Sequence, residues 1–296
     1  MLEKIKSRLP GGIYFTSLMF TLKNILLGQF NIGERYILMN YFFGGVYTHK
    51  KIYNILKKYY FKEGIFNFYG IKIPSLDNLE YNNQIDLCLQ FFDFIYPHFN
   101  SNFYSEIGEG PYEYEKVQIN SNDIVIDAGA NIGMFSVLAS HLGATVYAFE
   151  PVKEIREKSL EITAKLNDKI NVVPIALFNK AGYSEIEIDG KNLGGSSIIL
   201  HRQNSTRETI PTITLDEWAK QNNIPRVDFI KADIEGAERL MLQGAQWVLK
   251  TYAPKLSICT YHLTDDKEVL TKLILQANPN YKIIHKWKKL YAWVEK

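Results

Sequence analysis

The sequence lacks the features that mark disulfide-rich, membrane-spanning or polyanion-binding proteins. Cys88 and Cys259 are the only cysteines among 296 residues, which argues against a disulfide framework or a cysteine-rich metal site and fits a reducing compartment. The formal net charge is only +2, from 34 basic and 32 acidic residues, so no strong overall field would attract nucleic acid. The most apolar early stretch, 13–22, is too short to span a bilayer, and the amino terminus has no secretory pattern. We therefore expect a cytoplasmic protein with no transmembrane segment and no nucleic-acid partner.

The chain nevertheless has ample material for a folded core. Its hydrophobic content of 46% excludes a disordered protein, and its length allows one large core or two modest ones. Residues 1–108 are rich in Tyr, Phe, Lys and Asn and contain no chemical motif; they are predicted to form a mostly helical accessory region with a short hairpin over 66–74. This region would either shape a substrate pocket or form a contact in a homo-oligomer.

Strand and helix patterns alternate through residues 109–296, which predicts one α/β domain with a mostly parallel sheet covered on both faces. The last two strand patterns form a terminal antiparallel hairpin, and 182–189 forms an antiparallel excursion. Strand patterns occur at 124–127, 145–149, 170–176, 227–232, 254–260, 281–287 and 290–294, and helical patterns at 153–166, 237–249, 265–276 and from about 134.

A glycine-rich turn, Asp127-Ala128-Gly129-Ala130-Asn131-Ile132-Gly133, joins the first strand pattern of this domain to a helical one. Such a turn is where α/β proteins bind nucleotide-like cofactors, because glycine lets the backbone approach the ligand and the helix start supplies unpaired N–H groups. The next strand pattern ends at Glu150-Pro151, about 20 positions after Asp127, and an acid at this spacing can bind ribose hydroxyls.

The turn departs from the dinucleotide fingerprint G-x-G-x-x-G, because Asn131 stands between Gly129 and Gly133. A bulky pyrophosphate would require more glycine at this position. The pattern D-x-G-x-N-x-G, followed by an apolar strand and F-E-P, is similar to that of class I methyltransferases. Their cofactor, S-adenosylmethionine, has an amino acid end and no phosphate.

A later motif, Lys231-Ala232-Asp233-Ile234-Glu235-Gly236-Ala237-Glu238, completes the pattern. With it, the chain from about Glu109 to His262 resembles the FkbM-type family of S-adenosylmethionine-dependent methyltransferases. One departure is Ala232, where the family usually has Ile or Val. The matching residues are Gly110-Pro111-Tyr112-Glu113, Asp127 to Gly133, Phe149-Glu150-Pro151, Ala176-Leu177, Ser196-Ser197, Thr214-Leu215-Asp216, and the acids Asp233, Glu235 and Glu238.

The resemblance implies a class I, Rossmann-like methyltransferase fold, in which a mostly parallel seven-stranded sheet ends in an antiparallel hairpin. It also implies O-methylation of hydroxyl groups on sugars or secondary metabolites, and we favour a carbohydrate or glycan-type acceptor. Two alternatives stay open. The chain would otherwise be an NAD-dependent oxidoreductase on a Rossmann-like domain, or a noncatalytic scaffold that binds S-adenosylmethionine.

The cofactor-binding residues are assigned from the ends of successive strand patterns. Asp127 would face the cofactor's ammonium group, and backbone N–H groups near Gly129 and Gly133 would face its carboxylate. Glu150 would bind the ribose hydroxyls, and the segment 176–177 would wall the adenine. The predicted set is Asp127, Gly129, Asn131, Gly133, Glu150, Pro151, Ala176 and Leu177.

Methyl transfer to oxygen requires the enzyme to position a hydroxyl and to accept its proton. The predicted base is His262, and Asp233 and Glu235 would orient the substrate or the base. Three alternatives stay open: the acids only cap the following helix, His262 is merely structural, or the three residues bind Mg²⁺. We expect no metal. Ser196-Ser197 would either touch the substrate or only turn the chain.

Overall fold

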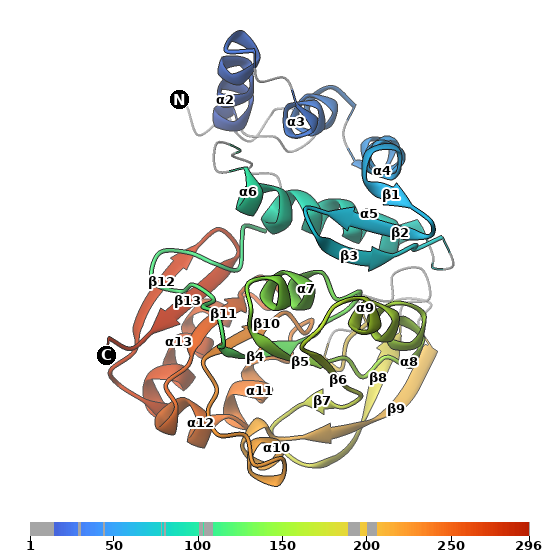
Figure 1. Ribbon diagram of the computed structural model, residues 1–296. Helices are drawn as coiled ribbons and strands as arrows, with labels where there is room; N and C mark the ends of the chain where they lie inside the picture. The colour runs from blue at the N-terminus through green and yellow to red at the C-terminus, as the bar shows by residue number, and fades with distance from the viewer. Residues whose placement is uncertain are drawn as a thin grey trace.

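A seven-stranded sheet forms the centre of the molecule (Figure 1). The computed structural model describes residues 15–28, 31–43, 45–77, 79, 81–100, 103, 109–188, 196–199 and 206–295. The strand order is β12-β13-β11-β10-β4-β5-β6. These strands are β4 (Ile124–Ala128), β5 (Thr145–Phe149), β6 (Ile170–Val173), β10 (Phe229–Ala232), β11 (Lys255–Cys259), β12 (Lys282–Lys286) and β13 (Lys289–Trp293).

Strand direction matches the prediction from sequence. The pairs β6–β5, β5–β4, β4–β10 and β10–β11 are parallel, whereas β13 runs antiparallel to both β11 and β12. The order reverses between β4 and β10, because successive parallel strands are added outward from this point in both directions. The predicted α/β fold with a mostly parallel sheet and a closing antiparallel hairpin is therefore confirmed.

Helices cover both faces of the sheet and enclose two cores (Figure 1). Because side chains of a strand alternate between faces, Val125 and Phe229 join one core while Ile126 and Ile230 join the other. Helices α7 (Met134–His141) and α9 (Glu161–Leu166) cover the first face, with α8 (Lys153–Ile155) and the π-helical segment η2 (Arg156–Leu160) before α9. The second face carries α10 (Leu215–Gln221), α11 (Glu238–Gln243), α12 (Gln246–Thr251) and α13 (Asp266–Ala277).

The single helix predicted over 237–249 is wrong, because the structure divides it into α11 and α12 at Gly244. A β-carbon at Gly244 would lie 2.1 Å from the carbonyl oxygen of Phe178, so only glycine allows this approach. The carboxylate of Asp216 then accepts hydrogen bonds from the backbone N–H groups of Trp247 and Val248 and starts the second helix. Both contacts come from distant segments, which local periodicity does not reveal.

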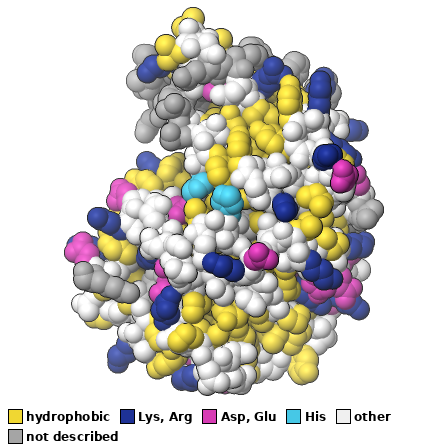
Figure 2. Space-filling view, in the orientation of Figure 1, with side chains coloured by type: hydrophobic (Ala, Val, Ile, Leu, Met, Phe, Trp, Pro, Cys, Tyr) yellow, Lys and Arg dark blue, Asp and Glu magenta, His cyan; other side chains and the backbone are white. Residues whose placement is uncertain are grey.

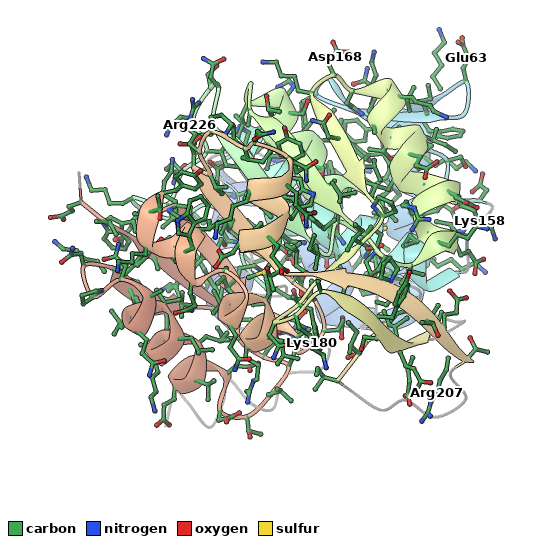
Figure 3. All side chains as sticks on the ribbon, turned by 90° about the horizontal axis from the view of Figure 1, so that it is seen from below. Glu63, Lys158, Asp168, Lys180, Arg207 and Arg226 are labelled. Carbon is green, nitrogen blue, oxygen red and sulfur yellow. The ribbon has the colours of Figure 1, made fainter. Side chains whose placement is uncertain are left out.

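The strand predicted over 170–176 also ends early, and its last residue belongs to a second, three-stranded sheet. In this sheet β7 (Ala176–Leu177) pairs in parallel with β9 (Thr206–Ile213), and β8 (Gly182–Ile188) is the expected antiparallel excursion. Figure 3 shows Arg207 at the outer end of β9, far from Arg226 on the opposite side of the molecule. Of the segment that closes the excursion, Gly194 and Gly195 lie outside the described residues.

The N-terminal region lies above the helices of the first face (Figure 1). A hairpin of β2 and β3 turns at Tyr69 and Gly70, and β3 packs against α7 and α9. The backbone of Lys72 exchanges two hydrogen bonds with the side chain of Asn167, and both segments share one hydrophobic core. The elements are α2 (Phe15–Leu26), α3 (Ile32–Phe43), α4 (Gly45–Tyr60), β1 (Phe61–Lys62), β2 (Ile65–Phe68), β3 (Ile71–Pro74), α5 (Tyr81–Gln90), the π-helical η1 (Phe91–Ile95) and α6 (Tyr96–Phe99). A domain boundary between 108 and 109 stays a prediction.

The surface mixes charged and apolar side chains. Figure 2 shows lysine, arginine, aspartate and glutamate interspersed with apolar groups on the viewed face. Among the helices that the structure describes, none has both the length and the apolar character needed to cross a bilayer. The cytoplasmic location stays a prediction.

We expect Gly129→Ala to reduce the free energy of unfolding by about 3 kcal/mol or more. The residue has a left-handed φ of +75°, and an added β-carbon would lie 2.0 Å from the carbonyl oxygen of Asp233. Gly64→Ala is the matched control, because Gly64 has a φ of +84° but nothing within 4 Å of an added β-carbon. Its expected loss is only about 1 kcal/mol, from backbone strain alone. Urea unfolding of both variants measures the difference, and equal losses would contradict a steric role for the Asp233 carbonyl.

Candidate active site

A cavity of about 430 Å³ opens at the carboxyl ends of β4, β5 and β10, where the strand order reverses. The turn after β4 and the segments after β5 and β10 form one wall. Helix α5, the segment η1 and the loop 109–112 of the chain form another. Among the described residues that line it, six are acidic and three are lysines: Asp86, Asp93, Glu109, Glu150, Asp233 and Glu235, with Lys231, Lys288 and Lys289.

The glycine-rich turn is shaped by contacts within the protein. Gly129 and Asn131 both line the cavity with left-handed φ angles of +75° and +52°, whereas Gly133 is not among the lining residues and precedes α7. The N–H of Gly129 donates to the carbonyl of Phe149, and the N–H of Gly133 donates to the carbonyl of Ala130. These two N–H groups are therefore already hydrogen bonded within the chain. The expectation that backbone N–H groups near Gly129 and Gly133 face a carboxylate stays a prediction. The side-chain oxygen of Asn131 is buried and has no hydrogen-bond partner in the described chain.

Asp127 lies beneath the cavity wall and is fully buried. Its carboxylate lies 3.0 Å from Nζ of Lys231 on β10, and it accepts a hydrogen bond from the hydroxyl of Ser136 on α7. Nζ of Lys231 also donates to the carbonyl oxygens of Ala128 and Gly129, at 3.2 and 2.6 Å. Asp127 is not among the residues that line the cavity, and its carboxylate pairs with Lys231 instead.

Glu150 lines the cavity directly after β5 and is 6% exposed. Its two carboxylate oxygens accept hydrogen bonds from the backbone N–H groups of Asn131 and Val152, both at 2.9 Å. Burial raises the pKa of Glu150, and the two backbone donors oppose that effect. Glu150 therefore joins the turn after β4 to the end of β5 and still presents its carboxylate to the cavity.

Pro151, Ala176 and Leu177 also line the cavity, as the sequence analysis expects of cofactor contacts. Their roles in binding stay predictions. Ser196 lines the cavity as well, whereas the hydroxyl of Ser197 donates to the backbone carbonyl of Glu235. The two serines therefore differ: Ser196 lines the cavity, and Ser197 hydrogen bonds to the backbone of the segment after β10.

Asp233, directly after β10, lines the cavity beside Glu109. One of its oxygens accepts a hydrogen bond from the hydroxyl of Tyr112 at 2.9 Å, and the other accepts from the hydroxyl of Tyr261 at 3.4 Å. Burial alone would raise the pKa of Asp233, but the positive charge of Lys231 and its other partners hold that pKa below the usual range. Asp233 is therefore ionised at neutral pH.

His262 lies behind Asp233, with 2% of its side chain exposed, and is not among the cavity-lining residues. Nδ1 lies 3.0 Å from Glu238, and Nε2 lies 3.6 Å from Asp233 and 3.8 Å from Glu235. Burial alone would lower the pKa of His262, but Glu238 and the other two carboxylates raise it to about 9. The ring is therefore mainly an imidazolium at neutral pH, and the structure places the other two predicted catalytic residues, Asp233 and Glu235, beside it.

Glu238 performs the local capping that was considered for the two acids. It is fully buried, and its carboxylate accepts hydrogen bonds from the backbone N–H groups of Ile234 and Gly236. Asp233 and Glu235 instead line the cavity. The N-cap residue of α11, Ala237, provides no side-chain hydrogen bond to the helix. An interpretation of Asp233 and Glu235 as mere helix caps is therefore wrong.

Three acids of the cavity were missed by sequence reasoning. Asp86 and Asp93 come from α5 and η1, and Glu109 stands at the start of the methyltransferase-like segment. Burial raises the pKa of Asp86 and of Asp93 to about 7, and it also raises the pKa of Glu109. The only signal in the sequence for Asp86 and Asp93 is that they stand about two helical turns apart in an otherwise aromatic segment. Such spacing is common in helices and does not by itself identify functional acids.

Two groups of side chains place potential metal ligands within 4.8 Å of one another: Glu109, Asp233 and Cys259, and Asp233, Glu238 and His262. The second group shares Asp233 and His262 with the Mg²⁺ site considered from sequence, but it contains Glu238 in place of Glu235. Both Glu238 oxygens already accept backbone hydrogen bonds, and a protonated His262 offers no lone pair. Whether the protein uses a metal stays a prediction.

We expect the folded protein to lose stability as pH rises through about 9, because the pKa of His262 is raised from 6.5 to about 9 in the folded state. The raised pKa means that this contribution is complete below pH 6.5 and disappears as the folded imidazolium deprotonates. Its size is on the order of 3 kcal/mol. His262→Asn should remove this part of the pH dependence. Urea unfolding across this pH window measures it, and identical slopes for both proteins would contradict the assignment.

Comparisons with known proteins agree with this geometry. The family model described as the Methyltransferase FkbM domain matches residues 127–283. The hexuronic acid methyltransferase AglP of Haloferax volcanii is 25% identical over 161 residues, which are 54% of this chain and 64% of AglP. The match thus spans less than two thirds of that relative.

Two solved structures are similar to part of this chain. Methyltransferase FkbM from Methylobacillus flagellatus KT has 23% sequence identity and a TM-score of 0.44, covering 60% of this chain and 45% of that one. The fibrillarin pre-rRNA processing protein of Methanococcus jannaschii has 16% identity and a TM-score of 0.37, covering 62% of this chain and 72% of that one. Because the family model covers more than half of the sequence, the chain belongs to the FkbM-domain family of S-adenosylmethionine-dependent methyltransferases.

Proposed function

We propose that this protein transfers a methyl group from S-adenosylmethionine to a hydroxyl group of a carbohydrate or glycan-type acceptor. The observation that carries the proposal is a single cavity that joins the cofactor turn and Glu150 to a pair of carboxylates, Glu109 and Asp233. A cofactor site and a proton acceptor within one enclosed space are what methyl transfer to a hydroxyl requires. Family membership supports the methyltransferase activity and disfavours the oxidoreductase alternative.

The residues present suit S-adenosylmethionine, which carries a sulfonium and an ammonium group. Six carboxylates face the cavity, while Lys231 and Lys289 are already bonded to backbone carbonyls. Glu150 would hold the ribose hydroxyls, and the unsatisfied side-chain oxygen of Asn131 would accept from the cofactor. The small side chain of Ala176 leaves room for a flat base beside β7. This donor set fits a cation with hydroxyl groups better than a pyrophosphate.

When bound, the cofactor supplies a methyl group already activated by its sulfonium. The chain's own residues must then hold the acceptor hydroxyl in line, keep water out and take up the hydroxyl proton. Tyr261 is suited to positioning, because its hydroxyl donates to Asp233 and lies in hydrogen-bonding reach of Glu109. The ring of Tyr112, beneath Lys289, adds an apolar wall at the same end of the cavity.

We assign proton uptake to Glu109 and an orienting role to Asp233. The two carboxylates lie close together but their environments separate their pKa values, since burial raises that of Glu109 whereas Lys231 and His262 help to lower that of Asp233. A carboxylate with the higher pKa is the better proton acceptor, provided that it is ionised. This differs from the sequence-based choice of His262, whose imidazolium form has no free lone pair.

His262 is better suited to positioning. Its charge lies among Asp233, Glu235 and Glu238 and offsets their mutual repulsion. Without it, Glu235 and Glu238 would lose their nearby positive charge, and Asp233 would keep only the influence of Lys231 and Lys289. The ring thus acts on the acceptor only through Asp233 and Glu235.

Two observations support a sugar-type acceptor. AglP, the relative described above, acts on a hexuronic acid according to its name, which supports a sugar acceptor. The cavity adds hydrogen-bond acceptors on several sides, as a polyhydroxylated acceptor requires. Lys288, which is half exposed and 3.8 Å from Glu109, is the cation best placed at the entrance to meet an acidic group.

We expect Glu150→Gln to weaken binding of S-adenosylhomocysteine by ~10–100-fold, because a neutral amide replaces a carboxylate that accepts from hydroxyl groups. Adenosine should lose a similar factor, since the affected group is the ribose. Isothermal titration calorimetry measures both ligands. Glu268→Gln on the exposed surface of α13 is the control, and unchanged affinity in Glu150→Gln would contradict the assignment.

We expect Glu109→Gln to lower kcat by ~10²–10⁴-fold with little change in cofactor affinity. The pH profile of kcat separates the two candidate bases. If Glu109 takes the proton, activity reaches its plateau well below pH 9, whereas a His262 base would require activity to rise up to about pH 9. Glu109→Asp, which keeps a carboxylate on a shorter side chain, should retain more of the rate than Glu109→Gln.

The acceptor itself is tested with labelled S-adenosylmethionine and a panel of nucleotide sugars and surface glycan fragments, followed by mass spectrometry. Methyl gain on a sugar hydroxyl would support the proposal and identify the acceptor class. Cofactor binding without transfer to any member of a broad panel, and with Asp233→Ala and His262→Ala behaving like the wild type, would favour the noncatalytic scaffold.

A further inference from the structure

An acid of the N-terminal region faces the cofactor turn. Asp86 on α5 and Asn131 on the turn after β4 both line the cavity, and the amide of Asn131 hydrogen bonds with the Asp86 carboxylate. The two residues come from segments that the sequence places in different regions. Helix α5 therefore closes the cavity over the part of the turn where the cofactor's amino acid end is expected.

Within the described ranges, no positively charged side chain balances Asp86. Besides Asn131, the groups that act on it most strongly are the carboxylates of Glu235, Glu109 and Asp233. No lysine, arginine or histidine of the described ranges forms an ion pair with it. Burial and these three acids raise the pKa of Asp86 to about 7. A carboxylate in such surroundings is stabilised by any cation that enters the cavity.

The other groups that might receive an ammonium ion near the turn are occupied. Asp127 is buried against Lys231, and that lysine also takes the carbonyl oxygens of Ala128 and Gly129. Glu150 accepts two backbone N–H groups, and its remaining acceptor sites are assigned to the ribose hydroxyls. The positions that commonly serve an amino acid end in this fold are thus used for internal bonds.

We propose that Asp86 pairs with the α-ammonium group of S-adenosylmethionine, so that helix α5 of the N-terminal region completes the cofactor site. Asp86 then replaces Asp127, the acid on which the sequence-based assignment relied. The role concerns cofactor binding alone and does not depend on which acceptor is methylated. It also gives the N-terminal region a function in the first step of catalysis.

Asp93 provides a matched comparison on the same continuous helical segment. It also lines the cavity and its pKa is likewise raised to about 7, but its carboxylate accepts the backbone N–H of Glu109 and faces Lys289. Asp86 and Asp93 are thus similar in type and burial, and differ in the part of the cavity that they face. Asp93→Asn controls for loss of one negative charge from the cavity.

The test compares S-adenosylhomocysteine with its analogue lacking the α-amino group, using calorimetry on the full chain. The wild type should bind the analogue ~10–100-fold more weakly. Asp86→Asn should weaken S-adenosylhomocysteine by a similar factor and should bind both ligands nearly equally. Asp93→Asn should keep the wild-type ratio between the two ligands.

Two results would overturn the proposal. One is an Asp86→Asn variant that keeps the wild-type ratio, and the other is a wild type that does not distinguish the ligands. Thermal unfolding and adenosine affinity show whether Asp86→Asn is folded, because adenosine lacks the amino acid end. If Asp86→Asn fails to fold, Asp86→Ala takes its place in the same comparison. It should likewise bind both ligands nearly equally, and a retained wild-type ratio would contradict the proposal.

A second measurement detects the protons that are released when the ligand binds. Pairing with a cation lowers the pKa of Asp86 from about 7, so binding of S-adenosylhomocysteine near neutral pH should release a fraction of a proton. Affinity should accordingly rise as pH increases through 7. Glu235, Glu109 and Asp233 face the same carboxylate and also titrate, so the release is compared between wild type and Asp86→Asn. Calorimetry in two buffers of different ionisation enthalpy measures it, and equal release in both proteins would contradict the pairing.

Discussion

The ion pair between Asp127 and Lys231 sets the geometry on which the site depends. The two residues are register partners on β4 and β10, at the point where the strand order reverses. A buried ion pair contributes little stability unless its remaining hydrogen-bonding groups are satisfied. Here Nζ of Lys231 has three acceptors and Asp127 has Ser136 as a second partner. The pair therefore fixes the direction in which the chain leaves β4.

This internal bonding decides which groups remain for ligands. The turn after β4 bonds to Phe149, Glu150 and Lys231, so the groups left to face the cavity are side chains such as Asn131 and the carboxylate of Glu150. The cavity is acidic because most of its lysines are bound to backbone carbonyls while its carboxylates face inward. A positively charged cofactor suits that balance. The same balance makes His262 an imidazolium, which is why we propose that a carboxylate of the cavity takes up the proton.

Much of the fold was predictable from sequence because its signals are local. Short apolar patterns marked β4, β5 and β11 to within a residue or two. The division of one helix at Gly244 was not predictable, because its cause is a carbonyl of Phe178 far away in the sequence. Asp86 on α5 and Asp93 on η1 were missed for the same reason, because helical spacing shows that two acids share a face but not which residues that face contacts.

The sequence by itself determined the α/β class, the position of the glycine-rich turn, the acid after the second strand and the family, because each is a short pattern whose physical meaning is contained within a few residues. Only the tertiary structure decided which charged side chains lie next to one another. It paired Asp127 with Lys231, brought Asp86 and Glu109 into the cavity and surrounded His262 with carboxylates. Charge acts through space over several ångströms, so the partners of an ionisable group follow from packing and not from neighbours along the chain.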